Sequence, residues 1–392
     1  MNIATRLSCI RPSATLAVNA KAAELKEQGQ KIISLAIGEP DFPTPVHICK
    51  AAQKAIDEGF TRYTAVSGIL ELRRAVGRYY KRCYDLEPPV ESVLVSNGGK
   101  HSLFNYFMAL LNAGDEVIIP APYWLSYPDM VQLAGGVPVF LPAGAQEGFK
   151  LRPERLVRAF TPKTRLLILN APSNPTGVSY SQEELDALIE CCVQHGVCVA
   201  SDEIYDRIVY APAKSVSAIQ WWQRCPELVT VFNGCAKSFS MTGWRVGYCV
   251  GHPKLIKAMD TIQSQSTSNV CSIAQKAAVA ALEGPYDCVA EMAAAFQRRR
   301  DLALNILSSW KGVLCPKPEG AFYLFADMSC YFGKSGIANS SDLCTYFLEK
   351  AGVALVPGLA FGDDACVRFS YAVADEVLEQ ALKSMERVLP AY

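Results

Sequence analysis

A lysine and an arginine, Lys237 and Arg245, stand eight residues apart in the stretch 232–247, which reads FNGCAKSFSMTGWRVG. Small residues flank the lysine and leave room for a bulky planar molecule. A lysine that loses its hydration there also loses its proton more easily, and the neutral amine can attack an aldehyde to form a Schiff base. The planar fork of an arginine suits a phosphate. The stretch therefore predicts a site for a small molecule with an aldehyde and a phosphate, and the alternative is a surface loop with an ion-paired arginine.

Short turns that carry polar or aromatic residues follow several expected strands. Apolar runs rich in β-branched residues alternate with helical patterns between residues 93 and 250, which predicts parallel strands covered by helices on both faces. The ligand of such a sheet lies beyond the carboxyl ends of its strands. The turns expected at that edge are NGGK (97–100), PYW (122–124), NPTG (174–177) and SDEIY (201–205).

The expected elements divide the chain into two regions. We predict a large α/β domain over residues 43–284 and a small α+β domain that combines residues 1–42 with residues 285–392. The expected strands are 32–37, 93–96, 116–119, 137–141, 166–169, 197–200, 228–232, 246–250, 321–326, 353–356 and 366–371. The expected helices are 16–28, 45–58, 69–80, 101–111, 125–133, 153–159, 182–194, 254–265, 273–284, 291–310 and 376–388.

The composition is that of a globular protein without a charge bias. Half of the 392 residues are hydrophobic, and 38 Lys and Arg balance 38 Asp and Glu. This balance gives no support for a nucleic-acid or anionic-membrane partner. No apolar run reaches the length of a transmembrane helix, and the N-terminus lacks the continuous apolar segment of a secretory signal. We therefore expect a cytoplasmic protein.

The cysteines and histidines show no ligand spacing. The fifteen cysteines contain no C-x-x-C pair, and the four histidines are dispersed along the chain. This argues against a disulfide scaffold and against a zinc site. We expect no metal, and we expect most cysteines to be buried small hydrophobic residues in a reducing compartment.

The ordered motifs NGGK, PYW, NPTG, SDEIY, AKSF, GWRVG and VRFSYA resemble those of class I aminotransferases, which have the type I fold of enzymes that bind pyridoxal phosphate (PLP). The resemblance covers essentially the whole chain. The segments RPSATLAVNAK, GGKHSLFNYF and APYWLSYPDM are similar more specifically to bacterial-type aspartate aminotransferases of the gamma subgroup, some of which accept prephenate. This resemblance implies reversible amino transfer between L-aspartate and 2-oxoglutarate, with PLP as cofactor, by a homodimer with shared sites.

The resemblance also implies which residues hold the cofactor. Lys237 would form the Schiff base and then act as general base and acid, and Asp202 would pair with the protonated pyridine nitrogen so that the ring can accept electrons. The other cofactor contacts would come from Gly99, Lys100 and Arg245 at the phosphate, Trp124 on the ring face, Asn174 and Tyr205 at the phenolic oxygen, and Tyr63 from a neighbouring subunit. Taken alone, Asp202 also suits a helix cap, Asn174 an ordinary turn, and Trp124 a core position.

Two cationic ends would hold the substrate. Arg368, in CVRFSYA, resembles the arginine that clamps the α-carboxylate, although a lone arginine there also suits a surface ion pair. The stretch SQSTSN (264–269) lacks the arginine that alpha-subgroup enzymes use for the distal carboxylate, and Gly234 stands where those enzymes carry a phosphate-binding serine. The remaining substrate contacts implied by the resemblance are Lys100, Ser13 and Thr15 at the distal carboxylate, Arg11 as the basic residue of prephenate-accepting members, and Gly38, Trp124 and Asn174.

Other functions remain open at this point. Within the aminotransferases, the rivals are prephenate, aromatic and alanine specificity. A PLP-dependent lyase that cleaves a Cβ substituent would share Lys237 and Asp202, and release of a keto acid without a second keto acid substrate would reveal it. A catalytically silent domain of the same fold could serve regulation, but no DNA-binding module or basic appendage is visible.

Overall fold

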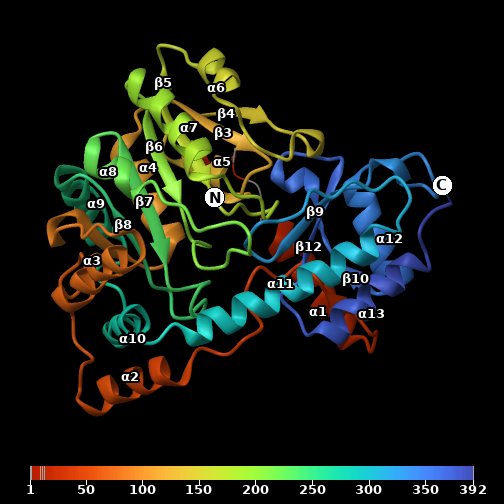
Figure 1. The fold of residues 1–392 in the computed structure, drawn as a ribbon, viewed down its shortest axis with the longest axis horizontal. Coiled ribbons are helices and arrows are strands. Elements are labelled where there is room, and N and C mark those ends of the chain that lie inside the picture. Colours follow the sequence, from red (N-terminus) through yellow and green to blue (C-terminus); the bar gives the residue numbers. More distant parts are fainter. Residues whose placement is uncertain (1, 9, 11, 13, 392) are drawn as a thin grey trace.

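The computed structural model describes residues 2–8, 10, 12 and 14–391, and its main feature is a seven-stranded sheet beside a smaller three-stranded one (Figure 1). The large sheet has the strand order β2-β8-β7-β6-β5-β3-β4. Its strands are β2 (Val93–Ser96), β3 (Glu116–Ala121), β4 (Val137–Pro142), β5 (Thr164–Asn170), β6 (Cys198–Asp202), β7 (Val229–Gly234) and β8 (Gly247–Val250). Each strand was expected from the sequence within a few residues of these bounds.

The large sheet is parallel except for β8, which runs antiparallel to both of its neighbours, β7 and β2. Residues 235–246 join β7 to β8 without a helix, whereas a parallel pair is usually joined by a crossover connection that contains a helix. The expectation of parallel strands was therefore wrong for β8, while the mostly parallel α/β class is confirmed. The short connection carries Lys237.

Helices cover both faces of this sheet. Alternate residues of one strand enter different hydrophobic clusters: Leu167 packs into one cluster, whereas Leu166 and Ile168 pack into the other. The first cluster contains side chains of α2 (Val46–Asp57), α3 (Leu70–Tyr84), α6 (Pro153–Ala159), α7 (Gln182–Gln194), α8 (Ile219–Arg224) and α10 (Ser272–Glu283). The second contains side chains of α4 (Gly99–Leu110), α5 (Ser126–Leu133) and α9 (Pro253–Ser266). No helix in the described part of the chain is both long and apolar enough to cross a membrane.

Both ends of the chain contribute to the second region. Its antiparallel sheet has the order β11 (Val356–Pro357), β12 (Cys366–Ser370) and β9 (Tyr323–Asp327), and β1 (Ile33–Ser34) pairs with β10 (Val353–Ala354). The helices are α1 (Ala14–Glu27), α11 (Asp287–Leu307), α12 (Ser340–Ala351) and α13 (Asp375–Glu386). The 3-10 helices of the chain are η1 (Thr5–Leu7), η2 (Val90–Ser92), η3 (Ala145–Glu147), η4 (Ser329–Tyr331) and η5 (Gly358–Phe361). A separate hydrophobic cluster lies here, and the domain division 1–42 and 285–392 against 43–284 stays a prediction.

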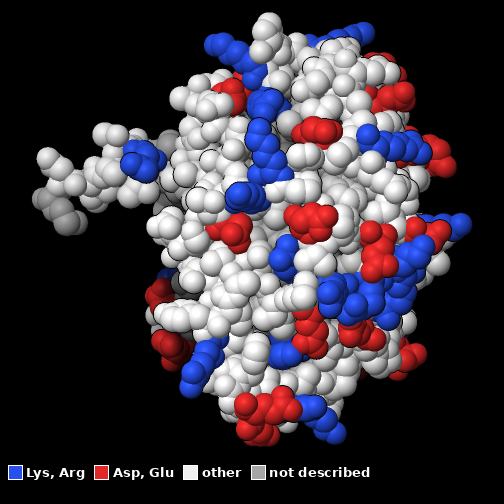
Figure 2. All heavy atoms as spheres, turned by 90° about the vertical axis from the view of Figure 1, so that its left-hand side faces the viewer, with Lys and Arg blue, Asp and Glu red and all other residues white. Residues whose placement is uncertain are grey.

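Charges of both signs are interspersed on the face that α3 and α10 help to form (Figure 2). Arg78 pairs with Glu283, Lys81 with Asp85, and Lys276 with Glu71. None of the cysteines in the described residues forms a disulfide. Only six of the 14 that the structure describes are buried, so the expectation that most are buried was wrong. Several of the others pack against the core from its edge, as Cys83 and Cys288 do.

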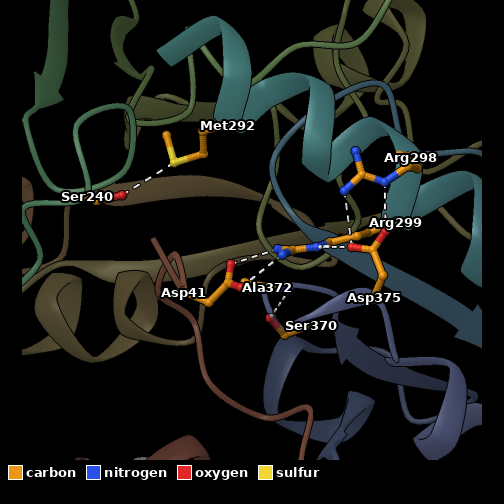
Figure 3. Close-up of polar contacts among 8 residues, drawn as sticks. All are labelled: Asp41, Ser240, Met292, Arg298, Arg299, Ser370, Ala372 and Asp375. Atoms are coloured by element: carbon orange, nitrogen blue, oxygen red, sulfur yellow. Dashed lines mark hydrogen bonds and ion pairs between the residues drawn. The ribbon is translucent and has the colours of Figure 1, made fainter. Parts of the chain in front are cut away.

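An arginine of α11 ties the segment after β1 to the start of α13 (Figure 3). Arg299 donates from Nη1 and Nη2 to the two carboxylate oxygens of Asp41, at 2.7 and 3.0 Å, and from Nε to Asp375 at 2.9 Å. Arg298 donates from Nε to the same Asp375 at 2.7 Å. Ser240, from the loop that carries Lys237, donates to the sulfur of Met292 on α11 at 3.3 Å. The helix α11 thus holds three separate segments near one another.

We expect Arg299→Met to lower the free energy of unfolding by about 2–3 kcal/mol, because Asp41 loses its partner and Asp375 keeps only the exposed Arg298. The Arg299 side chain is only 7% exposed. Arg298→Met is the matched control, since Arg298 bonds the same Asp375 but is 62% exposed, and it should cost less than about 1 kcal/mol. Urea unfolding at equal protein concentration measures both, and equal losses in the two variants would contradict this account of the cluster.

Candidate active site

A cavity of about 530 Å³ opens at the carboxyl edge of the large sheet and reaches the smaller sheet. Side chains from both regions line it, so the site forms only when the two are together. Of the residues predicted from the sequence, those that line this cavity are Thr15, Gly38, Gly99, Lys100, Trp124, Asn174, Asp202, Tyr205, Lys237, Arg245 and Arg368. Tyr63 lies outside it and is 91% exposed. The predicted residues Arg11 and Ser13 lie outside the described residues.

Lys237 stands in the β7–β8 connection with its amine turned toward the segment that follows β1. Its Nζ donates to the carbonyl oxygen of Gly38 at 2.5 Å. Burial lowers the pKa of Lys237 to about 8, with the carboxylate of Glu39 opposing and the cation of Arg368 adding to this shift. The amine is therefore much closer to its neutral, nucleophilic form at neutral pH than an ordinary lysine.

Gly234, at the end of β7, has a steric reason to be glycine. A Cβ there would lie 2.9 Å from the Cα of Gly247 on the adjacent strand and 3.0 Å from the carbonyl oxygen of Val246. The close pairing of β7 and β8 therefore leaves no room for a side chain. A serine at this position, as in the alpha-subgroup enzymes, would not fit this backbone arrangement.

Asp202 ends β6 and is buried at the floor of the cavity. Tyr127 donates its hydroxyl proton to Asp202 Oδ2 at 2.6 Å, and the backbone N–H of Ile204 donates to Oδ1 at 3.3 Å. Burial raises the pKa of Asp202 to about 6, so a nearby cation would favour its ionised form. Residues 204–207 form turns and no helix begins there, so Asp202 does not act as a helix cap.

Arg368 points from β12 into the same cavity and is 2% exposed. It donates from Nη1 to Asn174 Oδ1 at 3.0 Å and from Nη2 to the carbonyl oxygen of Ala36 at 2.8 Å, while its buried Nε has no partner among the described residues. No carboxylate of the described chain forms an ion pair with it, so it is not the surface ion pair that the sequence left open. A buried guanidinium with a free donor is suited to a ligand carboxylate.

Asn170 fixes the turn that carries Asn174. Its side-chain Oδ1 accepts from the backbone N–H of Asn174 at 2.8 Å, and its Nδ2 donates to the carbonyl oxygen of Asp202 at 2.9 Å. The ends of β5 and β6 are therefore cross-linked by one side chain. This contact brings the Asn174 amide, which already binds Arg368, close to the Asp202 end of the cavity.

The start of α4 and Arg245 form a second polar edge of the cavity. Gly98 precedes the helix with φ of +88°, and a Cβ there would lie 2.6 Å from Nη2 of Arg245. Glycine thus lets the guanidinium approach the first turn of α4. Arg245 otherwise donates only to backbone oxygens, those of Thr242 at 3.0 Å and Asn97 at 3.4 Å. Free N–H groups at a helix start, together with an arginine, suit a phosphate.

Lys100, in the first turn of α4, lines the same cavity as Arg368 and as Thr15 of α1. Its Nζ is 4.9 Å from the centre of the Trp124 ring, and burial together with the charge of Arg245 lowers its pKa. The Trp124 ring packs edge-on against Tyr127, with 5.2 Å between ring centres. Thr15, on α1, has a buried Oγ1 without a hydrogen-bond partner among the described residues. Lys100 and Thr15 therefore offer the cavity a further cation and a hydroxyl.

The cavity residues missed from the sequence include Glu39, Tyr127 and Tyr323. Tyr127 lies in the first turn of α5, three positions after Trp124 in the quoted segment APYWLSYPDM, and Trp124 precedes that helix. Tyr323 falls in a strand that was expected, where it reads as core. Glu39 lies in the loop GEPDF and accepts a hydrogen bond from Thr242 Oγ1 at 2.9 Å. No cluster of His, Cys, Asp and Glu that could hold a metal ion occurs in the part of the chain that the structure describes.

Comparisons with known proteins agree over the full length. A family model described as aminotransferase class I and II matches residues 30–385. A probable aspartate/prephenate aminotransferase of Rickettsia felis is 50% identical over 391 residues, which are 98% of this chain and 96% of the relative. The aspartate aminotransferase of Bacillus subtilis is 44% identical and covers 100% of both chains.

Solved structures give the same picture. The aspartate aminotransferase of Rhizobium meliloti superposes with a TM-score of 0.96 at 42% identity, over 100% of both chains. The aspartate aminotransferase of Thermus thermophilus, solved with maleate, superposes with a TM-score of 0.94 at 43% identity, over 99% of this chain and 100% of that one.

We expect Lys237 of the cofactor-free protein to react with formaldehyde at a pH where exposed lysines do not. With a pKa of about 8, against 10.5 for an ordinary lysine, half of its amines are neutral at pH 8, compared with less than about 1% of ordinary ones. Reductive methylation followed by peptide mapping should show labelling of Lys237 that rises with pH around a midpoint near 8. Labelling that rises together with the exposed lysines of the same digest would contradict the lowered pKa.

Proposed function

The chain belongs to the class I and II aminotransferase family, and from this premise we propose that it is a PLP-dependent aspartate aminotransferase. It would transfer the amino group of L-aspartate to 2-oxoglutarate and run the reaction in reverse. The single observation that carries the proposal is that the cationic side chains of Arg368 and Lys100 line the same cavity as Lys237. Two cations match a substrate with two carboxylates.

The residues around the cavity fit PLP. The phosphate would lie at the start of α4 beside Arg245, where N–H groups and a guanidinium are available. Asp202 would face the pyridine nitrogen, and Trp124 would cover the ring. Asn174 and Tyr205 would donate to the phenolic oxygen. When bound, PLP supplies an aldehyde and an electron-accepting ring.

The protein's own groups then handle the protons. Lys237 Nζ, whose pKa burial lowers to about 8, can take the proton from the substrate Cα and return it. The carboxylate of Asp202, buried beneath the cavity, keeps the facing nitrogen protonated once it is ionised. Arg368 fixes the α-carboxylate, so the Cα–H bond is held in one orientation near the lysine.

The distal carboxylate defines the substrate class. Lys100, with Thr15 as a hydroxyl donor, would bind it, and Ser13 and Arg11 keep the roles predicted from the sequence. Aromatic or alanine donors lack this second carboxylate and leave Lys100 unused. Prephenate is a second candidate acceptor because it also carries two carboxylates, and the relative from Rickettsia felis is named for both substrates.

We propose that two copies of the chain form a homodimer and work in the cytoplasm. Tyr63 supports the dimer, since it is 91% exposed in the single chain and a tyrosine there would reach the phosphate of a neighbouring site in related enzymes. An adjacent surface hollow of about 810 Å³, lined by Asn97, Trp244 and Arg245 among others, lies next to the phosphate edge. The cysteines of the described residues form no disulfide, which favours a reducing compartment such as the cytoplasm.

Removing the Lys100 cation should weaken catalysis for dicarboxylic donors alone. Lys100→Ala deletes a charge-assisted hydrogen bond of about 1.5–3 kcal/mol, which corresponds to a loss of roughly tenfold to hundredfold in kcat/KM for aspartate. Alanine and phenylalanine, which lack the distal carboxylate, should lose little and serve as the controls in a panel of amino donors against 2-oxoglutarate. Equal losses for all donors, with weaker PLP binding, would assign Lys100 to the phosphate instead.

Shared sites can be tested by mixing two inactive chains. Tyr63→Ala and Lys237→Ala homodimers should each have little activity, but a mixed dimer contains one site in which both residues are intact. Mixing the two variants in equal amounts, after mild dissociation, should restore up to about a quarter of the wild-type rate, because half of the dimers are mixed and half of their sites are intact. An active monomer in sedimentation, or mixed dimers without activity, would contradict sharing.

A further inference from the structure

We propose that Tyr323 is a positioning residue that donates a hydrogen bond to Tyr205 and so directs the Tyr205 hydroxyl proton at the phenolic oxygen of the cofactor. This inference rests on the proposed function, because it needs PLP in the cavity. Tyr323 belongs to the smaller sheet, and Tyr205 follows strand β6 of the larger sheet.

The two hydroxyls form a closed pair. Tyr205 follows β6 and Tyr323 begins β9, yet their hydroxyl oxygens are 3.0 Å apart. Both residues line the cavity, and both are buried, with exposed fractions of 3% and 0%. Neither hydroxyl has another hydrogen-bond partner within the described residues. Each hydroxyl therefore depends on the other in the ligand-free protein.

A bound cofactor would fix the direction of the hydrogen bond between Tyr205 and Tyr323. A phenol has one proton to give and can also accept, so either tyrosine can be the donor while the cavity holds no ligand. When the Tyr205 hydroxyl donates its hydrogen bond to the phenolic oxygen, it can only accept in the hydrogen bond between the two tyrosines. Tyr323 must then be the donor in that bond. A hydroxyl that accepts one bond becomes a better donor in the next. Tyr323 would thus strengthen the contact of Tyr205 with the cofactor.

Packing fixes the Tyr323 ring in this position. The guanidinium carbon of Arg368 lies 4.6 Å from the ring centre. Arg368 is on the adjacent antiparallel strand, two residues from Ser370, which pairs with Tyr323, so the two side chains are diagonal neighbours on one face. The ring therefore lies between the residue proposed to clamp the substrate and the residue proposed to hold the cofactor.

Gly38 leaves the space that the hydroxyl needs. A Cβ added at Gly38 would lie 3.0 Å from the Tyr323 oxygen, which is closer than ordinary van der Waals contact. The same Gly38 accepts the hydrogen bond from Lys237 through its carbonyl oxygen. A methyl group at this position would force the Tyr323 hydroxyl to shift without altering either tyrosine.

The direct test is the pH titration of the visible absorption of the PLP-loaded protein. A hydrogen-bond donor to the phenolic oxygen draws electron density from it. The proton on the Lys237 nitrogen beside that oxygen is then held less tightly, and its pKa falls. Tyr323→Phe weakens that donor and should raise the titration midpoint by about 0.3–1 pH unit. Tyr205→Phe, which removes the donor itself, should raise the midpoint further.

The double variant separates a role through Tyr205 from an independent one. If Tyr323 acts through Tyr205, Tyr205→Phe with Tyr323→Phe should titrate like Tyr205→Phe alone, because the Tyr205 hydroxyl through which Tyr323 acts is already absent. Additive shifts would overturn the proposal. Tyr371→Phe is the matched control: it deletes one hydroxyl from another buried tyrosine pair, Tyr371 with Tyr210 at 3.2 Å, and should leave the midpoint unchanged.

Gly38→Ala gives a second readout if Tyr323→Phe fails to fold. It should raise the midpoint in the same direction, because the added methyl displaces the Tyr323 hydroxyl. An unchanged midpoint in Tyr323→Phe, or in Gly38→Ala where the former does not fold, would overturn the positioning role. A wild-type protein that shows no visible band with PLP would instead overturn the proposed function on which this inference rests.

Discussion

A buried arginine, Arg368, and a half-buried lysine, Lys237, share one cavity, and neither forms an ion pair with a carboxylate of the described chain. Among the described residues, Arg368 donates hydrogen bonds to an amide oxygen and a backbone oxygen, and Lys237 donates one to a backbone oxygen. Leaving charge buried without a counter-charge costs several kcal/mol. The lysine meets this cost by a lowered pKa, whereas the arginine keeps its charge and a free Nε. The site is thus prepared for an anion at one position and for a neutral amine at the other.

Strands of both sheets bring the side chains of the cavity together. The parallel strands β5, β6 and β7 end at one edge of the large sheet, which places Asn174, Asp202 and Lys237 there. The short connection to the antiparallel β8 keeps Lys237 close to that edge. The smaller sheet supplies Arg368 and Tyr323 from adjacent strands. Since the cavity lies between the two sheets, contacts such as Ser240 with Met292, which join the loop of Lys237 to α11, also hold the site together.

Local signals carried much of the sequence-based prediction. The bounds of α6 and α7 were predicted residue for residue, because Pro153 and the Ser181–Glu184 capping box mark where these helices start. The direction of β8 was not predictable from its residues, because it depends on how the connection before it returns. The expected strand 353–356 is split into β10 and β11 because the two halves pair with different strands. Tyr127 and Tyr323 were missed because their partners, Asp202 and Tyr205, lie 75 and 118 residues away.

The central claim is that Lys237 is the lysine to which the cofactor becomes attached. Two lysines line the cavity, Lys237 and Lys100, and burial lowers the pKa of both. Borohydride reduction of the PLP-loaded protein makes the attachment permanent, and peptide mapping by mass spectrometry then identifies the lysine that carries it. This account predicts the label on Lys237 alone, and a label on Lys100, or on no cavity lysine, would contradict it.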